Sequence, residues 1–335
     1  MASTASPAST PAAATPRRFP GLLKIAGFFA LLTALTYAAD WIVSAGLKRI
    51  TTSKFGSLNR IMAGKVNADI IVNGSSRALF HYDPRVITAI TGRSAYNIGM
   101  VAARTNIQLA VLKSYLKNNA PPKLVLQNLE SFSLVTAKSG EIYDPTAFQP
   151  YLRRADDLYE AFRRISPEAW KWRHIPMYGY AVEDLKFTWA LGLLAWAGYS
   201  GPEIYHQGFY PRYDQWTDDF DKFRASAIHG LNYEIDPAGV AALTEIIELC
   251  RARGIDLILV YSPEFYEAQV LLQNRKEIFA VFRQLSEKYQ VPLWDYSDSP
   301  LSRQISLFYS SQHMNANGAE AFTTDLARRL RDRRP

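Results

Sequence analysis

Short apolar runs alternate with helical patterns along most of the chain after residue 68. Ile70, Ile71 and Val72 form a run that is too short for a helix, and their β-branched side chains favour a buried strand. Four more runs predict strands, at residues 94–98, 124–127, 257–260 and 291–294. Apolar residues at helical spacing lie between and after the strands, at residues 83–90, 105–118, 237–253, 274–289 and 316–331. This alternation predicts right-handed βαβ units, and therefore an α/β fold of three layers, α/β/α, with a central parallel sheet of about five strands.

The N-terminal part of the chain contains one long apolar segment, residues 22–47, whose only charged residues are Lys24 and Asp40. Lys24 can extend its ammonium group to the membrane surface, and Asp40 would lie near the far interface beside Trp41. We therefore expect one transmembrane helix. A cleaved signal peptide is the alternative, because the small residues near Ala38 suit a cleavage site.

These patterns predict four regions. Residues 1–20 are rich in Ala, Ser, Thr and Pro and hold too little apolar bulk to become ordered, so a disordered tail is expected. A transmembrane helix at 21–47 and a connector at 48–67 follow. The α/β domain then occupies 68–335, with an insertion at about 135–235 where the alternation of strands and helices is lost.

The insertion is rich in Tyr and Trp and is predicted to form a lid or a substrate wall. Its apolar run at residues 187–199 is short for a membrane span, so a buried core helix is the expected structure. Residues 208–216, Gly-Phe-Tyr-Pro-Arg-Tyr-Asp-Gln-Trp, form a predicted loop. Its aromatic rings either stack on sugar rings or pack the insertion onto the core, and the sequence leaves both interpretations open.

Charge and cysteine content exclude several classes of partner and cofactor. The net charge is +7, but many of the arginines lie near the N-terminus and in residues 327–335, where they are typical of a solvated helix end, so no nucleic-acid partner is predicted. A single cysteine, Cys250, excludes an intramolecular disulfide and a thiolate metal cluster. The five histidines are scattered without metal-ligand spacing, so neither a metal nor a cofactor is expected.

Residues with catalytic chemistry follow the ends of the predicted strands. Gly74 can form a sharp turn after the first strand, which places Ser76 at the start of the next helix, a position that suits a nucleophile and also an ordinary helix cap. In parallel sheets, ligands bind at the carboxyl ends of the strands. Ser76, Gly99 and Asn128 are therefore expected along one edge, and His313 would reach it from a loop late in the chain.

Five short motifs, taken in order, resemble the SGNH/GDSL hydrolase superfamily. They are Val72-Asn-Gly-Ser-Ser-Arg-Ala, Tyr96-Asn-Ile-Gly, Val260-Tyr-Ser-Pro-Glu, Trp294-Asp-Tyr-Ser and His313-Met-Asn-Ala-Asn-Gly-Ala-Glu. The Gly-Ser-Ser-Arg within the first motif is similar, more narrowly, to a membrane-anchored branch that resembles polysaccharide O-acetylation proteins. The resemblance covers most of residues 68–330 apart from the insertion, and it implies a flavodoxin-like form of the α/β/α fold.

The resemblance also implies a role for each motif residue. Ser76 would be the nucleophile, and His313 would be the general base that takes its proton and returns it to the leaving group. The backbone N–H groups of Ser76 and Gly99, together with the side chain of Asn128, would stabilise the oxyanion.

The third member of the triad departs from the family pattern. The family has Asp three residues before the His, and this chain has Ser310 there. A hydroxyl can orient the imidazole of His313 but cannot stabilise its charged form as a carboxylate does, and loss of that charge costs on the order of 10⁴ in rate. Asp295, at a predicted strand end, is the alternative acid.

The resemblance implies a serine esterase or O-acyltransferase that acts on acyl esters, such as acetyl esters, of a cell-surface or exported polysaccharide. The positive charges around the apolar segment slightly favour a cytoplasmic N-terminus. The globular domain is then expected in the periplasm, tethered to the cytoplasmic (inner) membrane, with an acylated glycan as substrate and a membrane-bound acyltransferase as a candidate partner. The alternative is a catalytically silent module of the same fold, which binds glycan or acts as a scaffold in an acyltransferase complex.

Overall fold

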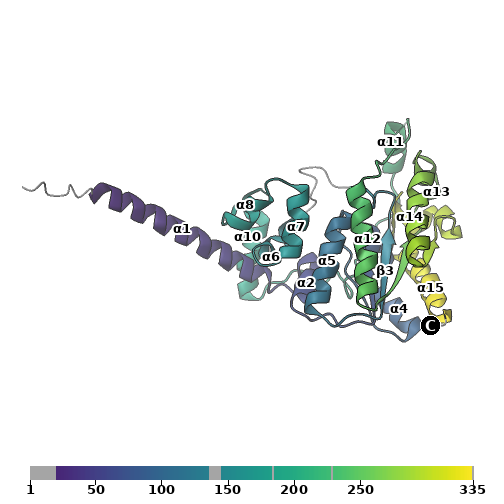
Figure 1. Cartoon of the computed structure of the whole chain (residues 1–335), viewed down its shortest axis with the longest axis horizontal. Coiled ribbons are helices and arrows are strands. Elements are labelled where there is room, and N and C mark those ends of the chain that lie inside the picture. The colour runs from purple at the N-terminus through teal and green to yellow at the C-terminus, as the bar shows by residue number, and fades with distance from the viewer. Residues whose placement is uncertain (1–19, 136–144, 183–184, 228, 334–335) are drawn as a thin grey trace, which may run out of the picture.

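A computed structural model describes residues 20–135, 145–182, 185–227 and 229–333. One long helix leads from the N-terminal side into a globular α/β domain (Figure 1). The tail predicted at 1–20 lies outside the described residues, apart from Pro20.

Five parallel strands form the central sheet, in the order β2-β1-β3-β4-β5. Strand β1 pairs with β2 on one side and β3 on the other, so that Val72 lies opposite Asn97 and Leu126. Because the strands are parallel, their carboxyl ends lie at one edge, and the predicted fold class is confirmed. The strands are β1 (Ile70–Asn73), β2 (Ala95–Asn97), β3 (Leu124–Leu129), β4 (Asp256–Tyr261) and β5 (Leu293–Asp295).

Helices cover both faces of the sheet. Successive side chains of a strand point to opposite faces, so Ile71 and Val125 pack with α2, α5, α12 and α14, whereas Ile70 and Val72 pack with α3, α4 and α15. The predicted helices are all present. Their bounds are α2 (Ser53–Met62), α3 (Ser76–His81), α4 (Pro84–Thr91), α5 (Thr105–Asn118), α12 (Pro237–Ala252), α14 (Arg275–Tyr289) and α15 (Ala316–Asp332), with the short α13 (Tyr266–Val270) and 3₁₀ turns at Pro300–Arg303 and Ile305–Leu307.

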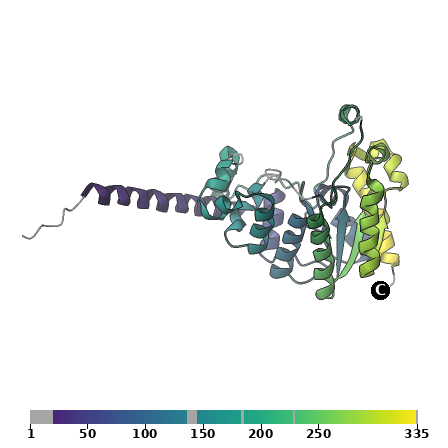
Figure 2. The ribbon, with the colours of Figure 1, turned by 45° about the horizontal axis from the view of Figure 1, so that its top comes forward.

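Helix α1 (Pro20–Leu47) extends away from the domain in both views (Figures 1 and 2), and its last turns are held by the insertion. It is the one helix among the described residues that is long and apolar enough to cross a membrane. The stretch at 48–67, predicted as a connector, contains α2. The insertion is built from η1 (Pro145–Ala147), α6 (Gln149–Leu152), α7 (Asp156–Ile165), α8 (Ala169–His174), α9 (Tyr178–Val182), α10 (Leu185–Leu194), η2 (Ala195–Ala197) and α11 (Asp219–Ser226).

One expectation about the apolar segments is wrong. Asp40, whose position at a membrane interface stays a prediction, is only 4% exposed, and its carboxylate accepts hydrogen bonds from the Arg153 guanidinium at 3.2 Å and from the Met177 backbone N–H at 2.7 Å. The run at 187–199 was expected to be a buried core helix. It forms most of α10 and all of η2, and several of its large side chains, Trp196 among them, are exposed, because it packs against α1 at the edge of the insertion and not inside the α/β core.

Candidate active site

Ser76 lies at the sharp turn between β1 and α3. Strand β1 ends at Asn73, Ser75 occupies the N-cap position, and Ser76 is the first residue of α3. The turn requires glycine at position 74, because a Cβ there would lie 2.7 Å from the Cβ of Ala78 and 2.9 Å from that of Asn128. This close packing brings the Ser76 hydroxyl to the carboxyl edge of the sheet.

His313 is presented by a small hairpin formed by β6 (Phe308–Ser310) and β7 (His313–Met314). The antiparallel register places Ser310 opposite His313. The Nε2 atom of His313 lies 2.8 Å from the Ser76 hydroxyl, and its Nδ1 lies 3.0 Å from the Ser310 hydroxyl. The expected contact between Ser76 and His313 is therefore present. With Nε2 as the acceptor for the Ser76 proton, a neutral ring carries its own proton on Nδ1 and donates it to Ser310.

Asp295 does not replace the missing acid. It ends β5 with an exposed side chain, and its carboxylate accepts hydrogen bonds from the backbone N–H and the hydroxyl of Ser297. Within the described residues, no carboxylate lies at ion-pair distance from His313. The side chain that orients the imidazole in this structure is Ser310, as its position in the motif implied.

Two of the three predicted oxyanion donors are occupied by partners inside the protein. The Gly99 N–H donates to the Asn97 side-chain oxygen at 2.9 Å, which closes a local turn. The Asn128 side chain is fully buried, where its amide donates to Glu130 at 3.3 Å and its oxygen accepts from the Tyr82 hydroxyl. The expected roles of Gly99 and Asn128 are therefore not supported in this conformation. The backbone N–H of Ser76 stays a prediction.

An aromatic wall formed by Phe80, Tyr210 and Tyr309 borders His313. The Tyr309 ring stacks on the imidazole, with centroids 5.5 Å apart and planes 10° apart, and Phe80 meets it edge-on at 5.4 Å. The Arg212 guanidinium lies 4.5 Å from the Tyr309 ring centre. Tyr210 and Arg212 come from the predicted loop at 208–216, which is thus a wall of the site. Arg212 was not predicted as a site residue, and only its place between two tyrosines in that loop could have indicated it.

Burial and two cations lower the proton affinity of the imidazole. Desolvation is the largest cause, followed by the positive charges of Arg77 and Arg212, and together they lower the pKa of His313 to about 3. The neutral ring is therefore the resting form at neutral pH. A neutral ring can accept the serine proton, but among the described residues no carboxylate lies at ion-pair distance from His313 to stabilise the imidazolium that follows.

A buried polar network lies beneath the site. The Arg77 guanidinium pairs with Glu264 at 3.2 Å and donates to the hydroxyl and carbonyl of Ser262. His81 contacts the same Ser262 hydroxyl at 3.1 Å and accepts the backbone N–H of Met314 at 3.0 Å. Burial holds the pKa of His81 well below its ordinary value, so its ring stays neutral and able to accept. The network connects the Ser76 helix to the His313 hairpin.

Glu130 closes this network on the β3 side. Its Oε1 accepts the backbone N–H of Arg77 at 3.3 Å, while its Oε2 has no hydrogen-bond partner among the described residues. Burial raises the pKa of Glu130 to about 7, against the opposing charge of Arg77. A buried carboxyl group with a pKa near 7 thus contacts the backbone of the residue that follows the candidate nucleophile.

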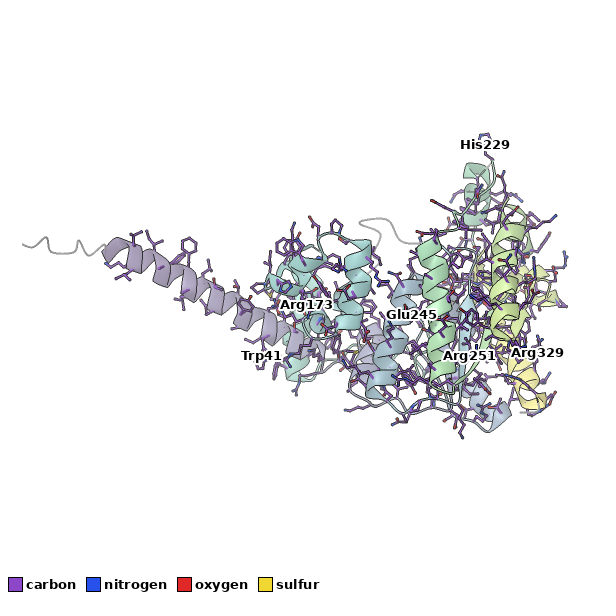
Figure 3. All side chains as sticks on the ribbon, in the orientation of Figure 1. Trp41, Arg173, His229, Glu245, Arg251 and Arg329 are labelled. Carbon is purple, nitrogen blue, oxygen red and sulfur yellow. The ribbon has the colours of Figure 1, made fainter. Side chains whose placement is uncertain are left out.

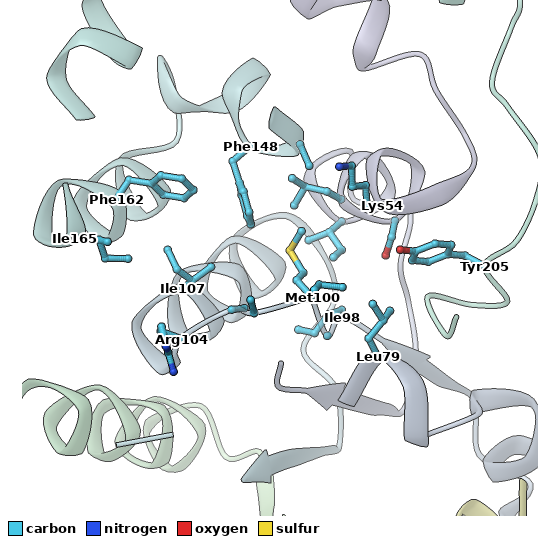
Figure 4. A pocket seen from close by; sticks show the side chains of 18 residues that line it. Lys54, Leu79, Ile98, Met100, Arg104, Ile107, Phe148, Phe162, Ile165 and Tyr205 are labelled. Carbon is cyan, nitrogen blue, oxygen red and sulfur yellow. The ribbon is translucent and has the colours of Figure 1, made fainter. Parts of the chain in front are cut away.

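An apolar pocket adjoins the site on the side of α2 and α7 (Figure 4). Part of its lining is close to the candidate site: Leu79 lies one turn after Ser76 on α3, and the loop from Ile98 to Arg104 contains Gly99. Ala102 of this loop adopts a left-handed backbone (φ 51°), a strained conformation for a residue with a Cβ. The rest of the lining comes mainly from α2, α5 and the insertion, with Phe148 and Ile107 pointing into the pocket.

Known families and curated proteins provide no match to the chain. No family model matches, and no curated protein matches either. Among the part of the chain that the structure describes, no cluster of three or more His, Cys, Asp or Glu side chains could hold a metal ion.

Some solved structures are similar to this chain in the overall course of the backbone. A protein named as an acylhydrolase from Bacteroides fragilis has 12% identity, a TM-score of 0.36, and coverage of 78% of this chain and 86% of its own. A GDSL-like lipase from Bacteroides thetaiotaomicron has 9% identity, a TM-score of 0.35, and coverage of 78% and 88%. An inhibitor-bound aryl esterase from M. smegmatis has 13% identity, a TM-score of 0.32, and coverage of 78% and 97%. The function is therefore argued from the site itself.

The substitution Ser310→Asp should change how the activity depends on pH. A carboxylate in the place of the Ser310 hydroxyl, which lies 3.0 Å from Nδ1, would favour the imidazolium. The pKa of His313 should therefore rise from about 3 towards or above its ordinary value. Because the neutral ring is the base, kcat/KM falls as pH drops through this pKa. We expect the acid limb to move to higher pH in Ser310→Asp, with a higher rate above it.

Two variants serve as controls in the same pH profiles. Ser310→Ala removes the hydrogen bond without adding charge, so the rate should fall modestly and the acid limb should stay at low pH. Ser311→Asp adds the same charge one residue further along the hairpin than the residue that contacts the His313 ring, and it should move the acid limb less. An unchanged acid limb in Ser310→Asp would contradict the assignment of Ser310 as the residue that orients His313.

Proposed function

We propose that the protein is a serine ester hydrolase or O-acyltransferase of the SGNH type. The observation that carries this proposal is the continuous chain of contacts from the Ser76 hydroxyl through both ring nitrogens of His313 to Ser310, at 2.8 and 3.0 Å. A serine at a sharp strand-to-helix turn, within reach of a neutral imidazole whose second nitrogen is oriented, is the arrangement that nucleophilic acyl transfer requires.

The proposed reaction has two steps. In the first, the Ser76 oxygen attacks the ester carbonyl while His313 Nε2 takes the hydroxyl proton, and the same nitrogen then gives the proton to the departing alcohol. The acyl group stays on Ser76 as an ester. In the second step, water or a sugar hydroxyl gives its proton to Nε2 and attacks that ester. The bond from the acyl carbon to the Ser76 oxygen breaks, Nε2 returns the proton to that oxygen, and an acid or a new ester is released.

We further propose a glycan as the second substrate, on the side of the aromatic wall. The surface beside Ser310 is a groove lined by Arg212, Trp216 and Tyr309 together with Asp214 and Gln215. Aromatic faces with adjacent hydrogen-bonding side chains suit sugar rings. With α1 as a membrane anchor, this site would act outside the cytoplasmic membrane on a cell-surface or exported polysaccharide, and a membrane-bound acyltransferase is a candidate partner.

The acyl group is proposed to occupy the apolar pocket on the opposite side of the site. The pocket borders the Gly99 loop and Leu79, and its volume is about 60 Å³. At about 10–15 Å³ for each water-sized group, this holds roughly four to six such groups, more than an acetyl group needs.

Filling this pocket should change the preference for acyl-chain length. Ala103 lines the pocket and is buried. Ala103→Leu should lower the turnover of hexanoyl esters at least tenfold and affect acetyl esters little, because only the longer acyl chain needs the space that the leucine side chain would occupy. The measurement is kcat/KM for p-nitrophenyl acetate and hexanoate. Ala238→Leu, at an exposed position of α12, is the matched control. Equal losses for both esters would argue against the acyl pocket.

A catalytically silent module is the second candidate. Its support is Ser310 in place of an acid, together with the internal partners of Gly99 and Asn128. A fluorophosphonate probe separates the two functions, because only an activated serine attacks it. The enzyme proposal expects covalent labelling of the wild type and none of Ser76→Ala. A wild-type protein that stays unlabelled, and that turns over no ester, would favour the silent module.

A further inference from the structure

The insertion carries a stripe of large apolar side chains beside α1. Trp189, Leu193 and Trp196 recur at the spacing i, i+4, i+7 along α10 and η2, and they are 38%, 43% and 44% exposed. The residues immediately before them, 188, 192 and 195, are buried. One face of this helix therefore packs inward, and the adjacent face stays uncovered by the described part of the chain.

The buried face of this helix is fitted closely to α1. A Cβ at Gly46 would lie 1.8 Å from the carbonyl oxygen of Gly192, so the two backbones are in contact. Contacts between small residues of this kind are typical of helix pairs in membranes. The Trp196 indole N–H donates to the Ile42 carbonyl at 3.0 Å, and its ring lies 6.3 Å from that of Trp41.

The exposure of α1 indicates where a bilayer would end. Residues 21–39 have few neighbours and are almost all exposed, and at 1.5 Å per residue they span about 28 Å, close to the thickness of a hydrocarbon core. Asp40, the next residue, is buried against Arg153 inside the insertion. Trp41 follows it and projects from α1 near the insertion (Figure 3). Trp41 and its neighbour Trp196 thus lie at the level where aromatic belts occur.

We propose that the stripe formed by Trp189, Leu193 and Trp196 inserts into the interface of the bilayer that α1 crosses, at the boundary between headgroups and acyl chains. The surface is continuous with the lipid-exposed surface of α1, and Arg49 lies 4.9 Å from the Trp196 ring, where its charge can reach lipid phosphates. This proposal rests on the membrane anchoring in the proposed function. The second attachment fixes the tilt of the domain, so the Ser76 edge is held at a constant height above the membrane.

Site-directed spin labelling of the full chain in phosphatidylcholine nanodiscs tests this proposal. The single native cysteine, Cys250, is buried with its pKa raised to about 12, so it should not react with the label. Labels are placed at Leu193→Cys, at Val270→Cys on α13, which is 78% exposed, and at Leu31→Cys on α1. Collisions with oxygen, which concentrates in the bilayer, are compared with collisions with a water-soluble nickel chelate.

The three positions give distinct outcomes. We expect the Leu31 label to be deep in the bilayer, the Val270 label to be in water, and the Leu193 label to be shielded from nickel and open to oxygen at interfacial depth. If the Leu31 label is in the bilayer and the Leu193 label is as open to nickel as that at Val270, the stripe does not insert and the proposal is wrong. If the Leu31 label is itself in water, the anchoring fails and this proposal is overturned with it.

Discussion

Ser76→Ala is expected to lower acyl-ester turnover at least about 10²-fold. A complete serine triad contributes about 10⁶ in rate and its carboxylate about 10⁴ of that, so a site that already lacks the carboxylate still owes roughly 10² to its nucleophile and base. The Ser76 hydroxyl has its proton acceptor in place, with His313 Nε2 at 2.8 Å. The measurement is kcat for a p-nitrophenyl ester, with wild type and variant at the same pH.

The neighbouring serine provides a matched control. Ser75 is fully buried, and its hydroxyl has no hydrogen-bond partner among the described residues, so Ser75→Ala should leave both folding and turnover almost unchanged. Turnover that survives in Ser76→Ala but falls in Ser75→Ala would move the nucleophile to residue 75. Turnover unaffected by either change would exclude this turn as the source of the nucleophile.

Arg77→Met is expected to destabilise the protein by about 3–5 kcal/mol. Arg77 is 1% exposed and is paired with the buried Glu264, so removing its charge leaves an uncompensated carboxylate in the interior. Adding Glu264→Gln should recover part of this loss, because the glutamine oxygen can still accept the Tyr261 hydroxyl that Glu264 accepts at 2.6 Å. The measurement is the free energy of unfolding from urea denaturation of the detergent-solubilised protein.

An exposed ion pair is the control for the effect of burial on the loss of stability. Arg224 pairs with Asp221 at 2.9 Å and Glu267 at 2.7 Å on the surface, and its side chain is 50% exposed. Arg224→Met should change stability by at most about 1 kcal/mol, since water replaces the lost partner. A similar loss in both variants would contradict the assignment of Arg77 as the ionic centre beneath the site. A double variant no more stable than Arg77→Met would show that the carboxylate charge of Glu264 is not the cause.

The parts of the fold that depend on local pattern were predictable. Ile70, Ile71 and Val72 form a strand because their burial on both faces of a parallel sheet requires a short apolar run, and such runs are visible in the sequence. The pairing of Ser310 with His313 is equally local. His313 is three positions after Ser310, and the hairpin turn brings the two side chains together. The motifs therefore located Ser76, His313 and Ser310 before any tertiary contact was known.

The internal hydrogen bonds of Gly99 and Asn128 are local in the chain only in part. A motif gives the position of a hydrogen-bond donor along the chain but not the acceptors that surround it. The Asn128 amide donates to Glu130, two residues away, but the Asn128 oxygen accepts from the Tyr82 hydroxyl, which lies in the turn between α3 and α4. Similarly, Arg212 reaches the site because its loop packs against α3 and α15, through backbone bonds that no spacing in the sequence predicts.

By itself, then, the sequence predicted the succession of strands and helices, the parallel sheet and the apolar α1 helix from the periodicity of adjacent residues, and its motifs indicated Ser76, Ser310 and His313 as candidate site residues through their resemblance to a known family. Only the tertiary structure decided which face of α10 is exposed, that Asp40 is buried, and that the Asp295 carboxylate binds Ser297 and not the imidazole. The physical reason is that burial and hydrogen-bond partners are set by segments far apart in the chain, such as α1 against α10, whose meeting depends on the packing of the whole fold.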